Sequence, residues 1–300
     1  MQTALLSACA LLLWRTNDAG SFSAPKQHEI VVARGSMLEV LKPGQYDELE
    51  GVYSEDCFAV LRHLATVRMP GSRRDLIVCA SDAGRVTVLE YNAGQGFRRV
   101  HCETFGRSSV RRITPGQYLA ADPRGRAFVI AATEKQKFAY VLNRDSSGEI
   151  TISSPLESHR PRTLMYDVAA LDVGYENPVF ACLEVDYTDA DDDPSGAAAA
   201  ETPKRLVFYE LDLGLNTVVR RWEEETDPSA HTIIGVPGAA GEGPGGCVVL
   251  ADSWVLYHRE GQPALRSPIP RREDLPDDAS LYLTAFATHR QRGLFFVLAQ

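Results

Sequence analysis

The 300-residue sequence lacks an apolar run as long as a bilayer span and lacks two of the features of a signal peptide. Its opening apolar run, TALLSACALLLW at residues 3–14, is shorter than the about 20 residues that span a bilayer. The run has the length of a signal-peptide core, but a basic region before it and an A-x-A-like cleavage site are missing. We therefore expect a first buried strand there in preference to a signal peptide.

Paired cysteines and glycosylation sites are also missing. The six cysteines are scattered singly, most of them in apolar runs such as LIVCAS and VFACLEV, and no N-x-S/T sequon occurs. No C-x-x-C pair or nearby cysteine and histidine cluster offers zinc ligands. We expect the cysteines to be small buried side chains of a protein in a reducing compartment.

Signatures of catalysis are absent or out of context. Neither HExxH nor G-x-S-x-G occurs. GEGPGG at 241–246 matches the dinucleotide pattern G-x-G-x-x-G, but Pro244 interrupts it and the strand-like CVVLADSWVLYH follows where a helix is required. We predict a plain loop there, and we interpret Asp172, Glu184 and Asp186 as polar rim residues rather than a catalytic pair. The sequence indicates no enzyme, metal or cofactor.

An excess of positive charge is missing as well. The net charge of −9 disfavours a direct grip on nucleic acid, whose affinity comes from lysine and arginine at phosphates. Arg107, Arg111 and Arg112 form a basic cluster that is too small for a nucleic-acid footprint. Any contact with nucleic acid is therefore expected to be indirect.

Short apolar runs separated by turn residues are what the sequence has in abundance. This spacing predicts an all-β sandwich, barrel or propeller. Two similar turns contain Gly84-Arg85 and Gly125-Arg126, and their separation of 41 residues suggests one propeller blade. The runs are EIVVARG, MLEVLK, DLIVCASD, RVTVLEYN, AFVIAAT, FAYVLNRD, EITISS, VAALDVGY, VFACLEVDY, RLVFYELDL, TIIGVPG, CVVLADSWVLYH and LFFVLAQ.

An aspartate-rich stretch, VDYTDADDDPSGAAAAETPK at 185–204, interrupts this pattern. A calcium loop that began at Asp189 would need glycine at its sixth position and a carboxylate at its twelfth, where Pro194 and Ala200 stand. An acidic interaction tail and a tolerated excursion between two strands are the alternatives. We expect a solvated hairpin loop whose charge discourages foreign strand pairing and is available to a basic partner.

Several longer blocks resemble one family. ETFGRSSVRRITPGQYLAADPRGRAFVIAATEKQKFAYVLNRD, TISSPLESH, YENPVFACLEVDY, FYELDLGLNTVVRRW and SPIPRR are similar to the N-terminal region of the splicing factor 3b subunit 3 family. The similarity runs from about residue 29 to the end of the chain. The related ubiquitin-ligase adaptor that binds damaged DNA and the large cleavage-and-polyadenylation subunit are expected to share mainly the turns that contain Gly-Arg.

The resemblance implies a non-catalytic nuclear scaffold in the complex that recognises the intron branch site during pre-mRNA splicing. Its fold would be the N-terminal propeller, of the seven-bladed type, in a multi-propeller protein. Its partners would be the helical-repeat large subunit and the small subunits of that complex. The residues implied to meet them are Glu103, Arg107, Arg111, Arg112, Gln117, Asn143, Arg144, Asp145, Glu157, His159, Arg160, Tyr166, Asp191, Asp192, Asp193, Tyr209, Glu210, Asp212, Arg220 and Ser280.

The resemblance also sets the expected domain boundaries. Residues 1–28 match weakly and are expected to form the first strand, and residues 29–300 are expected to form a propeller that stops before closure. The alternative functions are an adaptor of the ubiquitin-ligase or polyadenylation type and a propeller enzyme. The latter would need a set of carboxylates, histidines or a metal at its central channel, which the sequence does not supply.

Overall fold

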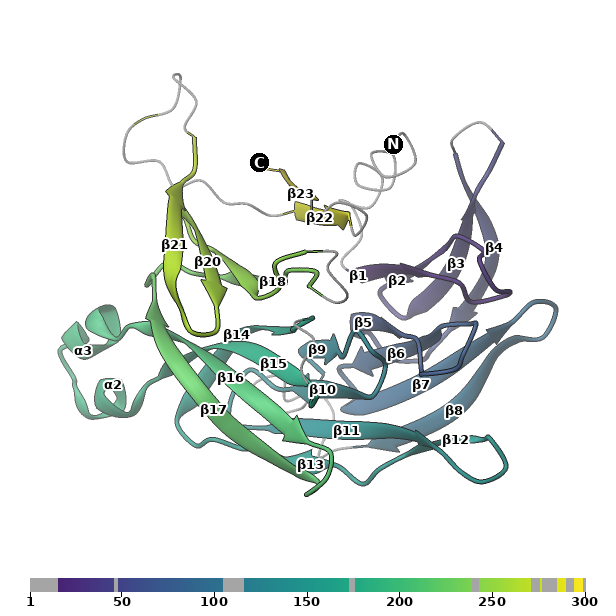
Figure 1. Cartoon of the computed structure of the whole chain (residues 1–300), viewed down its shortest axis with the longest axis horizontal. Helices are drawn as coiled ribbons and strands as arrows, with labels where there is room; N and C mark the ends of the chain where they lie inside the picture. The colour runs from purple at the N-terminus through teal and green to yellow at the C-terminus, as the bar shows by residue number, and fades with distance from the viewer. Residues whose placement is uncertain are drawn as a thin grey trace. The chain divides into compact units, whose positions relative to one another are not determined.

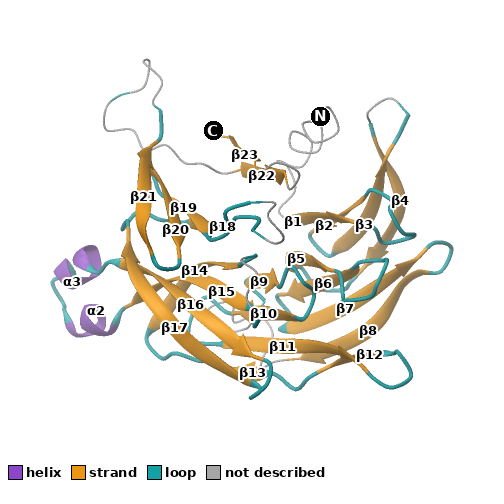
Figure 2. Ribbon diagram, viewed as in Figure 1, coloured by secondary structure: helices purple, strands orange, loops and turns teal. Residues whose placement is uncertain are grey.

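The computed structural model describes residues 16–45, 48–104, 116–172, 176–238, 243–270, 276, 285–289 and 294–298. These residues fall into two compact units, one of residues up to 160 together with 216–218, and one of the remainder. Strands dominate both units, and two short helices occur in the second (Figure 2). No helix in the described part is long and apolar enough to cross a membrane.

The first unit contains three antiparallel sheets, and each sheet is built from consecutive strands (Figure 1). Two sheets have four strands, and in the third a short fifth strand, β13, also pairs with β11. The strands are β1 (Thr16–Gly20), β2 (Glu29–Arg34), β3 (Met37–Pro43) and β4 (Leu49–Asp56); β5 (Leu61–Val67), β6 (Leu76–Ser81), β7 (Arg85–Asn92) and β8 (Gly96–Thr104); and β9 (Tyr118–Ala121), β10 (Ala127–Ala131), β11 (Lys137–Arg144), β12 (Ile150–Ile152) and β13 (Leu156–Glu157).

The second unit repeats this arrangement in two four-stranded sheets and adds a two-stranded one. The connection between β15 and β16 carries the helices. The elements are β14 (Thr163–Ala170), β15 (Val179–Asp186), α2 (Thr188–Asp192), α3 (Ala197–Glu201), β16 (Lys204–Asp212) and β17 (Thr217–Thr226); β18 (Thr232–Gly235), β19 (Cys247–Leu250), β20 (Trp254–Arg259) and β21 (Gln262–Pro268); and β22 (Ala285–His289) and β23 (Leu294–Leu298). Four-stranded sheets of consecutive strands are the blades of a β-propeller.

Apolar side chains of neighbouring sheets form the cores of the two units. In the first unit Phe128 and Tyr140 are buried and their rings stack at 5.0 Å. In the second unit the rings of Phe208 and Trp222 stack at 4.1 Å. Strand β6 is buried on both faces, because Val78 and Ala80 belong to one core cluster of the first unit and Ile77 and Cys79 to another. Such a strand has a continuous apolar sequence instead of an alternating one.

Aspartates on first strands join neighbouring sheets within each unit. Asp18 on β1 accepts hydrogen bonds from the Thr66 backbone N–H at 2.7 Å and hydroxyl at 2.9 Å, on β5. Asp167 on β14 accepts one from the Ile233 N–H on β18 at 2.7 Å. Burial raises the pKa of the Asp167 carboxyl to about 7. A polar side chain thus satisfies a backbone donor where two sheets meet.

The two Gly-Arg turns are not equivalent, so their spacing does not measure a blade. Gly84 lies between the second and third strands of its sheet, and Gly125 lies between the first and second strands of the next. Both have φ of 70°, and a Cβ on Gly125 would come within 1.9 Å of the Arg68 carbonyl oxygen. The turn equivalent to that of Gly84 contains Gly35, which is 49 residues earlier. The similar sequences reflect similar local turns.

The cysteines only partly follow the expectation of burial. Cys79, Cys182 and Cys247 are buried, whereas Cys102 is exposed and Cys57 is partly buried. These five cysteines are all free thiols. Desolvation raises the pKa of the Cys247 thiol to about 12, which keeps it protonated and unreactive. Cys9 and the apolar run at 3–14 lie outside the described residues.

The glycine-rich segment is a loop in its described part. The Gly246 backbone has φ of 82°, and a Cβ at this residue would lie 2.3 Å from the His258 carbonyl oxygen. Strand β19 begins at the next residue, so no helix N-terminus follows. The prediction of a plain loop is confirmed for residues 243–246, and residues 239–242 lie outside the described part.

Candidate protein-protein interface

The aspartate-rich stretch connects two paired strands, as expected, but it is not a plain loop. Strands β15 and β16 pair antiparallel, and α2 and α3 lie between them. The helices are one turn each, and residues 197–200, the alanine run, form most of α3. High alanine helix propensity explains α3, which the strand-based prediction missed. Among the described residues, neither this connection nor any other part of the chain groups three side chains that could hold a metal ion.

Asp193 organises this connection by accepting three hydrogen bonds. Its carboxylate accepts from the Ser195 N–H at 2.8 Å, the Ser195 hydroxyl at 2.6 Å and the Ala198 N–H at 2.8 Å. The bond from the Ala198 backbone, followed by those from Ser195, lowers the pKa of the Asp193 carboxyl. Asp193 therefore shapes the turn before α3, while Asp191 and Asp192 are exposed on α2.

The same geometry recurs at three other places. In each, an aspartate carboxylate oxygen accepts hydrogen bonds from both the N–H and the hydroxyl of the serine or threonine two residues later, an arrangement here named the D-x-S/T turn. Its hydroxyl hydrogen bonds are 2.6 to 2.7 Å long. The four pairs are Asp145 with Ser147, Asp186 with Thr188, Asp193 with Ser195, and Asp227 with Ser229. Their sequence signal is an aspartate followed two residues later by serine or threonine.

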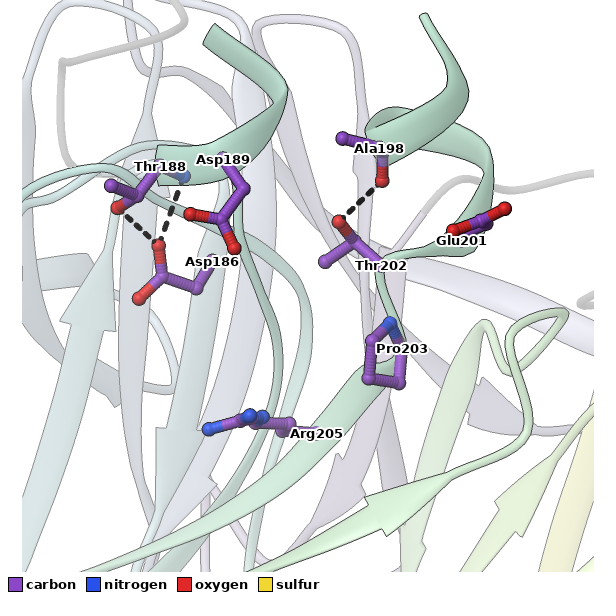
Figure 3. A pocket seen from close by; sticks show the side chains of 8 residues that line it. All are labelled: Asp186, Thr188, Asp189, Ala198, Glu201, Thr202, Pro203 and Arg205. Atoms are coloured by element: carbon purple, nitrogen blue, oxygen red, sulfur yellow. Dashed lines mark hydrogen bonds between the residues drawn. The ribbon is translucent and has the colours of Figure 1, made fainter. Parts of the chain in front are cut away.

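A pocket of about 500 Å³ lies beneath the two helices (Figure 3). Helix α2 and the end of β15 contribute Thr188, Asp189 and Asp186, and α3 contributes Ala198 and Glu201. The remaining lining residues are Thr202, Pro203 and Arg205. The pocket is therefore built almost entirely from the acidic connection and its flanking strand ends.

The charge of the pocket is negative on balance. Arg205 pairs with Glu223 at 3.4 Å and Glu225 at 4.0 Å, both on β17. Asp189 and Glu201 have no ion pair with the described residues. Two unneutralised carboxylates at the mouth of a pocket suit a lysine or arginine side chain of a partner.

Tyr166 lies exposed on β14 in the same unit. The Lys204 ammonium lies 4.0 Å from the centre of the Tyr166 ring and donates to the Ala230 carbonyl at 2.7 Å. Desolvation lowers the pKa of Lys204. An exposed aromatic ring held by a cation is a suitable contact residue for another protein.

The predicted residues of β16 and β17 divide between interior and surface. Tyr209 is 7% exposed, and its hydroxyl donates to Glu184 at 3.1 Å. Glu184 is only 2% exposed, so its interpretation as a rim residue is wrong: it is the buried acceptor of this bond. Burial and the Glu184 charge both raise the pKa of Tyr209. Tyr209 belongs to the core and is not accessible to a partner.

Glu210, Asp212 and Arg220 lie near the surface with intramolecular partners. Glu210 accepts from Asn177 and from Arg221, each at 2.8 Å. Asp212 accepts two backbone N–H bonds of the β16–β17 turn, both at 2.9 Å. Arg220 forms an ion pair with Glu223 on the same strand. These groups shape the β16–β17 hairpin, and their outer faces remain accessible.

The predicted residues of the first unit lie on β8, on the hairpin of β11 and β12, and near β13. Glu103 is 3.5 Å from His101 on β8. Asn143, Arg144 and Asp145 are exposed at the end of β11, where the Arg144 guanidinium donates to the Gly148 carbonyl at 2.8 Å.

The other described residues predicted for this unit lie around β13 and just before β9. The Glu157 carboxylate is 3.6 Å from His159, whose Nδ1 accepts the Lys137 N–H at 3.2 Å. Arg160 and Gln117 are partly buried. Arg107, Arg111, Arg112 and Ser280 lie outside the described residues. In the second unit the structure thus brings Tyr166 near the acidic connection that carries Asp191 to Asp193, and it places Glu210, Asp212 and Arg220 toward the β16–β17 hairpin. The predicted residues of the first unit are distributed over separate edges.

Comparisons with known proteins identify the family. The model of the RSE1/DDB1/CPSF1 first beta-propeller matches residues 19–300, so the match begins before the boundary expected at residue 29. Spliceosome-associated protein 130 A of Arabidopsis thaliana is 48% identical over 94% of this chain and 23% of its own length. Pre-mRNA-splicing factor rse1 of Emericella nidulans is 50% identical over 94% of this chain and 24% of its own length.

Splicing factor 3B subunit 3 of Danio rerio is 48% identical over 94% of this chain and 23% of its own length. The chain thus spans about a quarter of the length of these curated relatives. The predicted resemblance and the β-propeller class are both confirmed by these matches. The chain belongs to the family of the RSE1/DDB1/CPSF1 first beta-propeller.

Proposed function

We propose that this chain is the first propeller of a non-catalytic scaffold subunit that acts in pre-mRNA splicing in the nucleus. The observation that carries the proposal is the 48 to 50% identity, over 94% of the chain, to proteins named as splicing factors and a spliceosome-associated protein. The proposed partners are the helical-repeat large subunit and small subunits of the splicing factor 3b complex. RNA is reached only through that complex, consistent with the net charge of −9.

The acidic pocket is the proposed contact for a basic segment of one of these partners. Asp189 and Glu201 have no ion pair with the described residues, and exposed Asp191 and Asp192 extend the negative surface along α2. Complementary charges at such a rim steer association and fix its register more than they add affinity. The D-x-S/T turns at Asp186 and Asp193 hold this surface in shape before the partner arrives.

Affinity purification of the tagged full-length protein from nuclear extract tests the overall proposal. Mass spectrometry is expected to recover a helical-repeat splicing subunit with its small partners, and RNA sequencing the branch-site small nuclear RNA. Recovery of cullin-type ligase subunits or of polyadenylation factors in their place would contradict the splicing assignment and support the alternative adaptor function.

Charge reversal in the pocket tests the proposed contact separately. Asp189→Lys combined with Glu201→Lys is expected to lower the recovery of the large subunit and to shift its salt dependence, since rim charges act mainly on association. Glu48→Lys, an exposed carboxylate of the first unit, is the matched control. Equal recovery with the double variant and the control would remove the pocket from the interface while leaving the splicing assignment intact.

A further inference from the structure

Phe58 is an exposed aromatic side chain in an unusual backbone conformation. It lies between β4 and β5 and is 92% exposed. Its φ is 57°, in the left-handed region that bulky side chains seldom occupy. Single exposed apolar residues are common on protein surfaces, but an exposed ring in a strained conformation is not. Such strain persists where the surroundings impose it and is concentrated at functional sites.

Backbone hydrogen bonds on both sides of Phe58 impose this conformation. The Cys57 N–H donates to the Ser36 carbonyl at 2.8 Å, and the Leu61 N–H donates to the Gly35 carbonyl at 2.8 Å. Both acceptors belong to the turn between β2 and β3. The segment that carries the ring is therefore fixed at both ends.

Two aspartates complete the support. The Asp56 carboxylate accepts the Phe58 N–H at 2.8 Å. Asp82, in the turn between β6 and β7, accepts the Val60 N–H at 3.2 Å and pairs with Arg62 at 3.0 Å. A partner that binds a side chain on a pre-ordered backbone avoids much of the entropic cost of ordering a loop.

A small cavity of about 100 Å³ adjoins Phe58. Its apolar lining includes Cys57, Leu61, Leu89 and Phe97. A cavity of about 150 Å³ accommodates benzene, so this one is too small for an aromatic ring and suits an aliphatic side chain. Aromatic side chains beside such cavities are frequent contact residues at the centres of interfaces.

The unengaged hydrogen-bond donors around this cavity favour a partner that carries carboxylates. Arg85 and Arg99 line it, and neither guanidinium has an ion pair or hydrogen bond with the described residues. The two carboxylates of the lining are already engaged: Glu55 accepts from the Tyr53 hydroxyl at 3.0 Å, and Asp56 accepts the Phe58 N–H. The four charged groups of the lining balance formally, but the two guanidinium groups are the ones whose donors are left unengaged by the described residues.

We propose that Phe58, Arg85 and Arg99 form a second docking surface, which binds a partner protein segment with an aliphatic side chain flanked by carboxylates. The aliphatic group enters the cavity beside the Phe58 ring, and the carboxylates pair with the two guanidinium groups, where arginine forms two parallel hydrogen bonds. This surface lies in the first unit and shares no residue with the acidic pocket of the second.

A photo-crosslinking experiment tests the proposal in the intact assembly. The full-length protein carries p-benzoylphenylalanine in place of Phe58, and the complex is purified and irradiated. The expected product is a crosslink to one segment of another subunit that contains an aliphatic residue and at least two carboxylates within a few positions. The same substitution at Leu265, which is 65% exposed on β21, is the background control.

Two variants separate binding from folding. Arg85→Glu with Arg99→Glu is expected to lower the crosslink yield by roughly tenfold, since two exposed charge pairs are reversed. Arg73→Glu, an exposed arginine outside the cavity lining, is the matched control. Without the photoreactive group, Phe58→Gly relieves the positive φ and is expected to leave the melting temperature unchanged or raised, while recovery of the crosslinked subunit falls.

Several results would overturn the proposal. They are a crosslink within the same chain, a partner segment without carboxylates, and a yield no higher than that from position 265. A Phe58→Gly variant that melts lower and still retains the partner would assign the residue a purely structural role. Recovery of the large subunit is measured in the same samples, so failure of this docking surface is distinguishable from failure of assembly.

Discussion

The second strand and the outermost strand of a sheet contrast sharply in burial. All six residues of β6 are buried, and so are all five of β10. All seven residues of β21 are exposed, and on β17 only Thr226 is buried. The second strands carry apolar groups on both faces, whereas the outermost strands carry charged pairs such as Arg221 with Glu210. Stability therefore depends on the second strands, and the outermost strands are left available for contacts with other proteins.

The largest effect is expected from truncation of a buried strand. Phe128→Ala on β10 should lower the free energy of unfolding by about 3 to 5 kcal/mol, because it leaves a cavity beside the Tyr140 ring. Leu265→Ala on β21 should change it by no more than about 0.5 kcal/mol. Urea-dependent hydrogen exchange of the strand peptides measures both free energies. Similar losses for the two variants would contradict the conclusion that stability depends on the second strands.

A smaller effect is expected from the D-x-S/T turns. Asp227→Ala removes the bonds to Ser229 and the ion pair with Arg266 at 3.1 Å, and should cost about 1 to 2 kcal/mol. Asp192→Ala, on the exposed side of α2, should cost less than about 0.5 kcal/mol while weakening partner recovery. Chemical denaturation compares their stabilities. An Asp192 variant as unstable as the Asp227 variant would show that the exposed aspartates also support the fold.

The pH dependence tests the aspartate that joins two sheets. The pKa of Asp167 is raised to about 7 in the folded state, against about 4 when unfolded. Its contribution to stability is therefore complete below about pH 4 and declines as the pH rises to about 7. Asp167→Asn keeps an acceptor for the Ile233 N–H and should flatten the decline. The urea unfolding midpoints of the wild type and the Asp167→Asn variant, measured between pH 5 and 8, report this decline in stability. An equal pH dependence of the two midpoints would argue against a raised pKa of Asp167.

The smallest effect is expected on the outer face of β8. The Arg98 guanidinium pairs with Glu90 at 2.6 Å and is about half exposed. Arg98→Ala should lower the free energy of unfolding by only about 0.2 to 1 kcal/mol, because exposed ion pairs are screened by water and salt. Thermal melts at low and high salt measure this loss of stability. Its disappearance at high salt would show that an exposed ion pair contributes far less to stability than a buried strand residue.

The contrast also explains how much of the fold the sequence could predict. Apolar runs located the second and third strands of the sheets, including β2, β6, β10, β15 and β19. None of the predicted runs fell on β4, β8, β17 or β21, because these strands are mostly exposed and carry too few core-facing apolar residues, such as Tyr53, Phe97 and Trp222, to form an apolar run. The apolar runs alone indicated an all-β sandwich, barrel or propeller, and the family resemblance selected the propeller.

The candidate interface was less predictable than the fold. The acidic connection was located correctly, but α2 and α3 depend on local propensity and on the turn at Asp193, which a strand pattern does not contain. Tyr209 and Glu184 were misjudged because they bond to each other inside the core. Phe58 carries no sequence signal at all, since its segment is held by hydrogen bonds that its backbone donates to the Gly35 and Ser36 carbonyls and the Asp82 carboxylate, which are distant in sequence.

The most direct test of the division between core and contact strands is hydrogen exchange of the full-length protein, free and in the purified splicing complex. The account predicts that amides of β17 and of the acidic connection at 187–203 become protected in the complex. Amides of β15 and β10 should exchange slowly and equally in both states. Unchanged exchange in the outermost strands and the acidic connection, or protection that increases only in the buried strands, would contradict it.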